Sequence, residues 1–584
     1  MKALLLLFVP CLCLAQSYNS NIATTSGNWN VCTTWNNPLK IYNSSNSEKV
    51  ISNNVAVAEN ISYVAAKKIT FLGNGRIDFI GSNRISFFES FPNEDVTCDT
   101  TDSLIDKVTV NLAQPVMAKS LSGFLGGLSA STSVPDRDKV RELKPKLFRT
   151  SHRDQYQESY DIAGRVHYTT NNVWANTWDP VDGLYNIQKD KPYEEQSYID
   201  YLEALFEWGY SNGSIKPGIV WECWNEPEPP NIYSNWLYED FYETYRVFYQ
   251  TLRDSALGDT ALAAGPSYAS FTEQKMKNFF DYCLANNLEV NVVTWHEASN
   301  PDQDYKPFPL LKAHVEYVRD NFMNNPKYAS LEIQSIEINE MIWGGDKNRP
   351  VEIAGHLRNL EDAGIDYACK TGWLHIANTN AQGSLETVEC GNPDVKLYSS
   401  EDTSLDDLFT IDYDSQHYIN NSNDCQPSNN GGEVKSGWWV YKLYSDGVDY
   451  RVKSYNEQAW STVISSCKIQ PYLQTTPSVT AQVLFGYTQF YPAPYIAASG
   501  TYKMRINDVK YMVTTTDTCY VKILRIPFNA ADSFNGYEDN TPLSNPEPFI
   551  ASTQYDIVNN GIDLIIHDIE PEHLYQILIS ASQF

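Results

Sequence analysis

The sequence has no long apolar run after its first residues, and it has little positive charge. No later stretch of about 18 apolar residues occurs, so we expect no membrane span. Lys and Arg total 43 against 72 Asp and Glu, which gives a net charge of −29. Because like charges repel at long range, this balance disfavours nucleic acids and anionic polysaccharides as partners. The Cys-x-x-Cys and His-x-x-x-His spacings typical of zinc sites are also absent, which argues against zinc.

The first segment, residues 1–15, predicts a secretory signal peptide. Lys2 gives a positive start, an apolar core follows, and the small residue Ala15 precedes the expected cleavage site. We therefore expect a secreted, extracellular protein. Sequons in such a protein predict N-glycosylation, and they occur at Asn43, Asn60, Asn212 and Asn420.

The cysteines fit the same compartment. Eleven are present, and removing the two in the signal segment leaves nine, an odd number, so at least one is unpaired. An oxidising compartment favours disulfides, and the pairs we expect are Cys32–Cys98 and Cys390–Cys425. Cys223 and Cys369 fall in apolar, strand-like runs and are expected to be buried thiols.

The chain of 584 residues is too long for one compact core, so two to four domains are expected. Residues 16–105 are polar, with short β-like runs between Gly and Asn turns. They predict an N-terminal all-β module that binds carbohydrate or acts as a spacer. Strands dominate again over residues 447–584, which predicts a C-terminal β-sandwich domain. Between them, residues 106–446 alternate short apolar strands with longer amphipathic segments.

The middle region predicts an α/β fold of the (β/α)8, or TIM-barrel, type. Segments with helical spacing, such as 198–208 and 351–363, separate its strands, and 437–446 is expected to be the closing helix. The polar segment 378–432 is a long insertion after the eighth strand. The eight strand candidates are 122–125, 146–149, 165–168, 219–224, 261–265, 290–295, 335–338 and 367–373.

The fourth strand candidate runs into the segment Asn225-Glu226-Pro227. In barrels of this type the carboxyl ends of the strands carry the catalytic residues. A carboxyl group held there among Trp rings and apolar walls is expected to have a raised pKa, which suits a general acid. The alternative is an ordinary strand-terminating turn, since Asn and Pro are both turn formers.

The seventh strand candidate carries a second acid. Positions two apart in a strand face the same way, so Ile336, Ile338 and Glu340 share one face, with Glu340 at the carboxyl end. Glu337 lies earlier and faces the other way, and it stays open as the alternative. Strands four and seven lie on opposite sides of an eight-stranded barrel, so acids at their ends can face each other across a sugar. Retaining glycoside hydrolysis needs two carboxyl groups about 5–5.5 Å apart.

These segments resemble those of clan A glycoside hydrolases, most of all glycoside hydrolase family 39, whose members include β-xylosidases and α-L-iduronidases. The resemblance covers residues 115–584. It implies that Glu226 is the general acid/base, that Asn225 orients the sugar 2-hydroxyl group and that Glu340 is the nucleophile. The segment around Glu340 departs from the family's Thr-Glu-aromatic-Asn pattern, to which Glu337-Ile338-Asn339 can be aligned instead.

The resemblance also implies substrate-binding residues at other strand ends. Arg149, at the end of the second strand, would hydrogen-bond the nucleophile and keep it ionised. His296 would face the subsite from the sixth strand, and Trp373, at the end of the eighth, would stack on the sugar. His167 and Trp174, in and after the third strand, are further subsite candidates. Taken singly, each residue also has an ordinary structural interpretation as an ion-pair or packing residue.

Together these features predict a secreted retaining glycoside hydrolase that cleaves a polysaccharide or an oligosaccharide, with endo action favoured over exo action. Aromatic residues make up 13% of the chain, including 39 Tyr and 14 Trp, which fits sugar stacking as well as large cores. No metal or organic cofactor is implied, and we expect a monomer whose partner is its carbohydrate substrate. Two alternatives stay open. One is a catalytically silent carbohydrate-binding or extracellular matrix protein, and the other is a transglycosylase that uses the same carboxylates.

Overall fold

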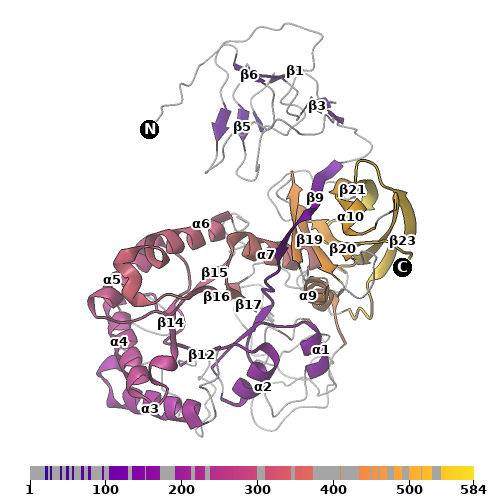
Figure 1. The fold of residues 1–584 in the computed structure, drawn as a ribbon. Helices are drawn as coiled ribbons and strands as arrows, with labels where there is room; N and C mark the ends of the chain where they lie inside the picture. Colours follow the sequence, from indigo (N-terminus) through magenta and orange to yellow (C-terminus); the bar gives the residue numbers. More distant parts are fainter. Residues whose placement is uncertain are drawn as a thin grey trace, which may run out of the picture.

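The structure of the protein is a computed structural model, drawn in Figure 1. The expected signal peptide, the four sequons and the four cysteines of the expected disulfides lie outside the described residues. The structure describes the strands named below within residues 20–97, and residues 104–128, 135–151, 153–170, 191–211, 218–229, 237–298, 309–342, 349–371, 405, 408–409, 433–446, 450–457, 461–469, 479–488, 499–514, 516–528 and 541–584.

The N-terminal strands are short and pair mostly in parallel. β1, β4 and β6 form one parallel sheet, β2, β5 and β7 form a second, and β3 and β8 are antiparallel. A carbohydrate-binding or spacer role for this region stays a prediction. The strands are β1 (Ser20–Ala23), β2 (Gly27–Asn28), β3 (Lys40–Tyr42), β4 (Glu48–Ile51), β5 (Val55–Val57), β6 (Lys68–Phe71), β7 (Ile77–Phe79) and β8 (Asp95–Thr97).

Eight parallel strands, β10 to β17, close into a barrel in chain order. This confirms the barrel that the sequence predicts, and each of the eight strand candidates overlaps an observed strand. Helices surround the barrel, as Figure 1 shows. The strands are β10 (Gly123–Leu125), β11 (Leu147–Thr150), β12 (Val166–Thr169), β13 (Ile219–Glu222), β14 (Leu262–Tyr268), β15 (Val292–Ala298), β16 (Ser335–Ile342) and β17 (Tyr367–Thr371).

The helices alternate with the strands. Helices α1 and α2 were not predicted, because their polar sequences carry little apolar periodicity; α1 buries only Val140. The π-helical turn Arg319–Met323 continues α6. The helices of the barrel are α1 (Arg137–Glu142), α2 (Arg153–Ala163), α3 (Gln196–Ser211), α4 (Tyr238–Asp254), α5 (Glu273–Ala285), α6 (Pro309–Val318), α7 (Pro350–Ala363) and α9 (Ser436–Asp446), with short 3₁₀ turns at Pro192–Glu194, Gly258–Thr260 and Pro326–Leu331.

The barrel strands are buried on both faces, as expected for parallel strands covered by helices. Outward-facing side chains pack against the helices; Trp221 of β13, for example, meets Phe206 of α3 edge to face, with ring centroids 5.2 Å apart. Several side chains inside the barrel are charged, and Arg149, Glu222 and Glu337 are all buried. Since a buried charge is costly unless it is paired, these groups need partners inside the barrel.

The C-terminal strands form one nine-stranded, mostly antiparallel sheet in the order β23-β22-β25-β20-β19-β18-β9-β21-β24. The sequence predicts a sandwich of two sheets, whereas these described strands belong to a single sheet. Val521 of β22 and Leu564 of β24, from opposite ends of the order, share one apolar core, so the sheet encloses that core. The elements are β18 (Tyr450–Asn456), β19 (Ser461–Ile469), β20 (Val479–Tyr487), β21 (Gly500–Asn507), α10 (Val509–Met512), β22 (Thr518–Ile526), β23 (Glu547–Asp556), β24 (Ile562–Ile569) and β25 (Leu574–Ser580).

β9 (Leu104–Met117) belongs to this sheet, although it precedes the barrel in the chain. It pairs antiparallel with β18 and parallel with β21, and Figure 1 shows it beside the C-terminal strands. The domain boundary expected at residue 106 assigns this strand to the barrel, and the pairing corrects that assignment. The alternating residues Val108, Val110 and Leu112 are buried in the apolar core of the sheet, which explains where the strand lies.

Polar contacts attach the sheet to α7 and α9 of the barrel. Oε1 of Glu361, on α7, accepts hydrogen bonds from Arg451 Nε of β18 and from the Tyr444 hydroxyl group of α9, each at 2.6 Å. Gln482 of β20 donates to the carbonyl oxygen of Leu443 at 2.9 Å. In the part of the chain that the structure describes, no helix is long and apolar enough to cross a membrane.

The cysteines of the described strands and helices are buried. Cys223, which follows β13, is a buried free thiol, as the sequence predicts. Cys369 of β17 is also fully buried. Burial raises the pKa of the Cys223 thiol well above its ordinary value, so this thiol is a packing group rather than a nucleophile.

Candidate active site

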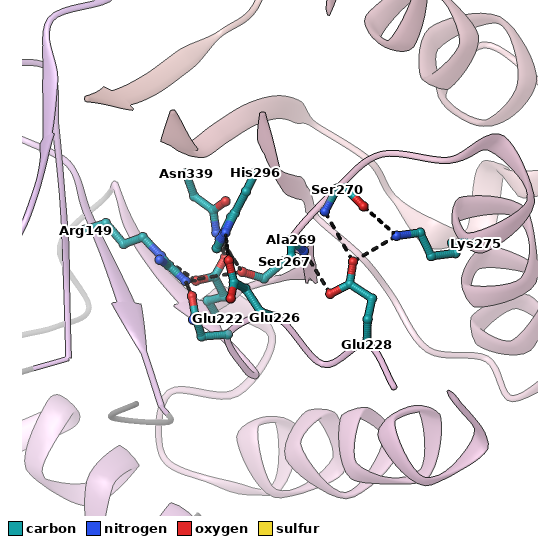
Figure 2. Close-up of polar contacts among 11 residues, drawn as sticks. Arg149, Glu222, Glu226, Glu228, Ser267, Ala269, Ser270, Lys275, His296 and Asn339 are labelled. Atoms are coloured by element: carbon teal, nitrogen blue, oxygen red, sulfur yellow. Dashed lines mark hydrogen bonds and ion pairs between the residues drawn. The ribbon is translucent and has the colours of Figure 1, made fainter. Parts of the chain in front are cut away.

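Glu226 and His296 meet at the carboxyl end of the barrel (Figure 2). Glu226 follows β13, and His296 lies in β15. Oε1 of Glu226 is 2.9 Å from Nδ1 of His296. The imidazole is fully buried, whereas 24% of the Glu226 side chain is exposed. A partly accessible carboxyl group held by a buried histidine at this end of a barrel has the placement of a proton-transfer residue.

The backbone around Glu226 is strained. Glu226 has φ 49° and Ser267, in β14, has φ 58°, both in the left-handed region that favours glycine. For a residue with a side chain this conformation costs roughly 1–2 kcal/mol. The Glu226 N–H group donates to the Ser267 carbonyl oxygen at 3.0 Å, so the two strained residues are hydrogen-bonded to each other. Such strain persists only where the surroundings enforce it, and it is typical of functional sites.

Opposing effects set the pKa of Glu226. Burial of the carboxyl group raises its pKa, but the hydrogen bond from His296, the charge of His296 and the charge of Arg149 together more than offset burial, so the pKa lies below its ordinary value. The sequence predicts a raised pKa from the apolar surroundings. That prediction is wrong, because the group nearest to the carboxylate is a hydrogen-bond donor. Glu226 is therefore ionised near neutral pH in the unliganded protein.

Arg149 and Glu222 form a buried ion pair beneath Glu226. Arg149 reaches Oε2 of Glu222 through Nε at 2.8 Å and Nη2 at 2.7 Å, and Thr169 donates to the same oxygen at 2.8 Å. The amide group of Asn339, in β16, donates to the other oxygen. Burial raises the pKa of Glu222, but the charge of Arg149 is chief among the effects that bring it below its ordinary value. Glu222 is thus a buried carboxylate that fixes Arg149.

Arg149 also holds Asn225. Its Nη2 donates to Oδ1 of Asn225 at 2.7 Å, and both side chains are buried. Asn225 precedes Glu226, so this bond fixes the loop immediately before the candidate acid. The structure therefore brings four predicted residues together, namely Arg149, Asn225, Glu226 and His296.

The hydroxyl group of Ser267 connects the ion pair to the histidine. Its oxygen accepts from Arg149 Nη2 at 3.2 Å and from Asn339 Nδ2 at 2.9 Å, and it lies 3.4 Å from Nε2 of His296. Because the ionised carboxylate of Glu226 can only accept, Nδ1 of His296 carries a proton and donates it to this hydrogen bond.

The backbone of Glu340 is described, but its side chain lies outside the described residues. In β16 the pairing with β15 is interrupted by a register shift: Ile338 is opposite Trp295, and Glu340 is opposite His296, so Asn339 is the extra residue. A bulge of this kind changes the alternation that a regular strand would have. The register therefore places the backbone of Glu340 directly beside that of His296.

Glu337 lies deeper in the barrel than the site. Its side chain is fully buried and pairs with Arg165, which precedes β12, and with Nε2 of His167 at 2.5 Å. Burial raises the pKa of Glu337, but the charges of His167 and Arg165 lower it to about 2 overall. His167 is itself fully buried. The expectation that His167 lines a sugar subsite is therefore corrected, because its ring is enclosed within the barrel.

Two predicted substrate-binding residues, Trp174 and Trp373, lie outside the described residues. Four residues of the site were not predicted as such from the sequence: Glu222, Glu228, Ser267 and Asn339. Glu222 ends an apolar strand four positions before Glu226, which is a signal that could have been used. Ser267 has no comparable signal, because its role depends on the bulge and backbone conformation at the end of β14.

Solved structures of other proteins resemble this chain. N2152 from Neocallimastix frontalis aligns with a TM-score of 0.53 and 17% identity, over 82% of this chain and 100% of that chain. A glucosidase from Croceicoccus marinus gives 0.49 and 12%, over 82% and 100%. A bacterial orthologue of human α-L-iduronidase gives 0.49 and 10%, over 82% and 84%.

The first of these similarities shows the fold alone, because the sequence identity is low. No protein-family profile and no curated protein matches the sequence. Membership of glycoside hydrolase family 39 therefore remains a prediction from the segments around Glu226 and Glu340.

Proposed function

We propose that the protein is a retaining glycoside hydrolase in which Glu226 is the general acid/base and Glu340 is the nucleophile. The observation that carries this proposal is the contact of 2.9 Å between Glu226 and the buried His296 at the carboxyl end of a closed barrel. The register of β16, which places the backbone of Glu340 opposite His296, supports the choice of Glu340. Glu337 is already paired deep in the barrel, which favours a structural role for it.

In the first chemical step the Glu340 carboxylate attacks the anomeric carbon and forms a glycosyl ester. The bond from that carbon to the leaving oxygen breaks, and the oxygen keeps the electron pair and takes a proton from Glu226. Glu226 must bind a proton before this step, since its lowered pKa leaves it ionised near neutral pH. We therefore expect an acidic pH optimum.

In the second step a water molecule attacks the anomeric carbon. The Glu226 carboxylate accepts a proton from the water, and the ester bond to Glu340 breaks, which returns both groups to their starting states. The Nδ1–H group of His296 stabilises Glu226 in its ionised form, which is the form that acts as the base. This chemistry uses side chains of the chain itself.

The proposed substrate is a polysaccharide cleaved internally, and the protein is proposed to be a secreted monomer. Support for the substrate comes from the aromatic content and the long polar insertion 378–432, and support for secretion comes from the apolar segment 1–15. An acidic chain of net charge −29 favours neutral polysaccharides over anionic ones.

The test is a screen of the secreted protein against neutral and charged plant, algal and animal polysaccharides. Reducing ends are assayed, products are sized, and the Glu226→Gln variant is the blank. We expect oligosaccharides from one polysaccharide with the wild type and none with the variant. Binding of a polysaccharide in affinity electrophoresis without any cleavage would instead identify a carbohydrate-binding protein. New, longer products on addition of an acceptor sugar would identify a transglycosylase.

A further inference from the structure

Glu228 lies two residues after Glu226, and its carboxylate fastens the loop that carries Glu226. Oε2 accepts from the backbone N–H of Ala269 at 2.8 Å, and Oε1 accepts from the backbone N–H of Ser270 at 3.2 Å. Oε1 also pairs with Nζ of Lys275 at 2.9 Å. Ala269 and Ser270 follow β14, and Lys275 lies in the first turn of α5. One side chain thus joins the loop after β13 to the loop after β14 and to α5 (Figure 2).

These contacts are shielded from solvent. Only 14% of the Glu228 side chain and 16% of the Lys275 side chain are exposed. Nζ of Lys275 also donates to Oγ of Ser270 at 3.0 Å and lies 5.3 Å from the ring centre of Tyr268. Exposed ion pairs contribute little to stability. A shielded carboxylate that accepts hydrogen bonds from a charged group and from backbone N–H groups is held firmly in place.

The contacts of the Glu228 carboxylate lie just beyond the end of the β13–β14 ladder. The ladder pairs Glu222 with Ala264, and the next connection is the bond from the Glu226 N–H group to Ser267. The Glu228 carboxylate supplies the connection after that, to Ala269 and Ser270. Glu226 therefore lies between two points at which the loops are joined.

The two residues joined by the backbone bond between the loops, Glu226 and Ser267, have unfavourable backbone conformations. Glu226 and Ser267 both have φ in the left-handed region, so the loop would relax elsewhere if its contacts were lost. Relaxation would move the Glu226 carboxyl group relative to His296 and to the leaving oxygen. A shift of about 1 Å in a reacting group can cost about 100-fold in rate.

We propose that Glu228 is a positioning residue that holds Glu226 where it can protonate the leaving group, an inference that rests on the proposed acid/base role of Glu226. The described contacts of its carboxylate are to Ala269, Ser270 and Lys275 and not to Glu226. Glu228 acts through the backbone of both loops. Misplacement of Glu226 would impair proton donation to the leaving group. The loss of kcat/KM should therefore be larger for leaving groups that depend more on acid assistance.

The test measures kcat/KM for Glu228→Gln on aryl β-D-xylosides, or on aryl glycosides of another sugar if the polysaccharide screen identifies one. The panel runs from 2,4-dinitrophenyl to unactivated phenyl leaving groups. We expect kcat/KM to fall by about 10- to 100-fold for phenyl glycosides and by less than about threefold for 2,4-dinitrophenyl glycosides, which need no acid. Lys275→Met, which keeps both backbone bonds to Glu228, should show the same pattern with a smaller loss.

The matched control is Glu289→Gln, which breaks another partly buried ion pair of the barrel, to Arg253 at 2.7 Å. It should leave the dependence on the leaving group unchanged. Equal losses across the panel in both Glu228→Gln and Lys275→Met, or no loss at all, would overturn the positioning role. Glu226→Gln run in parallel separates the two proposals. If Glu226→Gln shows the leaving-group dependence and the Glu228 and Lys275 variants do not, only the positioning role is wrong. If Glu226→Gln lacks it too, the acid assignment is wrong, and the role of Glu228 is wrong with it.

Discussion

His296 and Glu226, which belong to different βα units of the barrel, meet through Nδ1 and Oε1 at a distance of 2.9 Å. The hydroxyl group of Ser267 lies on the other side of the imidazole, 3.4 Å from Nε2. The ring thus lies between a hydroxyl group and the carboxylate that accepts its Nδ1 hydrogen bond. This arrangement orients the carboxyl group and at the same time stabilises its ionised form.

Removing the imidazole should shift the pH dependence of activity. In His296→Ala the donor that lowers the pKa of Glu226 is lost, while burial, which raises it, remains in part. The pKa of Glu226 should therefore rise. The alkaline limb of kcat/KM, which reports the free enzyme's general acid, should move to higher pH. Profiles of kcat/KM against pH on an unactivated substrate measure the shift.

The control for this experiment is His314→Ala. Nδ1 of His314 bonds Oε1 of Glu297 at 2.6 Å, so a histidine–carboxylate contact is lost without touching Glu226. The alkaline limb of the kcat/KM profile of His314→Ala should coincide with that of the wild type. An unchanged limb in His296→Ala would show that another group is the general acid.

Glu226→Gln should separate substrates by leaving group. General acid catalysis contributes about 10²- to 10⁴-fold, so kcat/KM for unactivated glycosides should fall by that range. Activated aryl glycosides should retain most of their kcat/KM, and added azide should raise their turnover, because azide attacks the glycosyl-enzyme without needing a base. Loss by the same factor on both kinds of substrate would contradict the acid role.

Glu340→Ala should be nearly inactive on every substrate, because no glycosyl ester can form. Azide should partly restore turnover with activated glycosides and give a glycosyl azide of inverted anomeric configuration. Glu337→Ala provides the comparison, since its side chain pairs with Arg165 and His167 in the barrel interior. Rescue of Glu337→Ala by azide, rather than of Glu340→Ala, would exchange the two roles.

Glu337→Gln should reduce stability in a pH-dependent way. The variant leaves Arg165 without its negatively charged partner, and breaking a buried ion pair costs about 3–5 kcal/mol. The pKa of Glu337 is lowered from 4.5 to about 2 in the folded protein. The contribution of the ionised Glu337 to the free energy of unfolding is therefore complete above the ordinary pKa, and it disappears as the pH falls through about 2.

Thermal unfolding midpoints of wild type and Glu337→Gln, measured from pH 7 to pH 2, test this. The difference between the two proteins should be largest near neutral pH and should shrink below the ordinary carboxyl pKa. Glu316→Gln is the control, since its side chain is 59% exposed on α6 and should have little effect. A difference that stays constant with pH would show that Glu337 is not ionised in the folded protein.

The sequence predicts the barrel well because its signals are local. Each barrel strand is a short apolar run bounded by turn-forming residues, and amphipathic helices such as Tyr238–Asp254 separate the strands. The position of Glu226 after the fourth strand follows from the same patterns. Arg149 and His296 also lie at strand ends, so their meeting with Glu226 follows once the barrel closes in chain order.

Other features could not be predicted, because they depend on long-range pairing. β9 precedes the barrel but pairs with β18 and β21, more than 300 residues later, as the pairs Lys453–Asn111 and Lys503–Lys107 show. The strand alternation in β16 places Glu340 with Ile338, but the register shift opposite His296 interrupts that alternation. A bulge depends on the neighbouring strand as well as on the strand's own sequence.

The sequence by itself determined the order of the barrel strands and the presence of an acid at the end of the fourth one. Apolar periodicity and turn residues act over a few positions, and they suffice for both. The tertiary structure alone decided that the pKa of Glu226 is lowered, that His167 is enclosed with Glu337, and that Ser267 orients the histidine. Each of these depends on the balance between burial and a specific partner, and that partner is brought close only when distant strands pair.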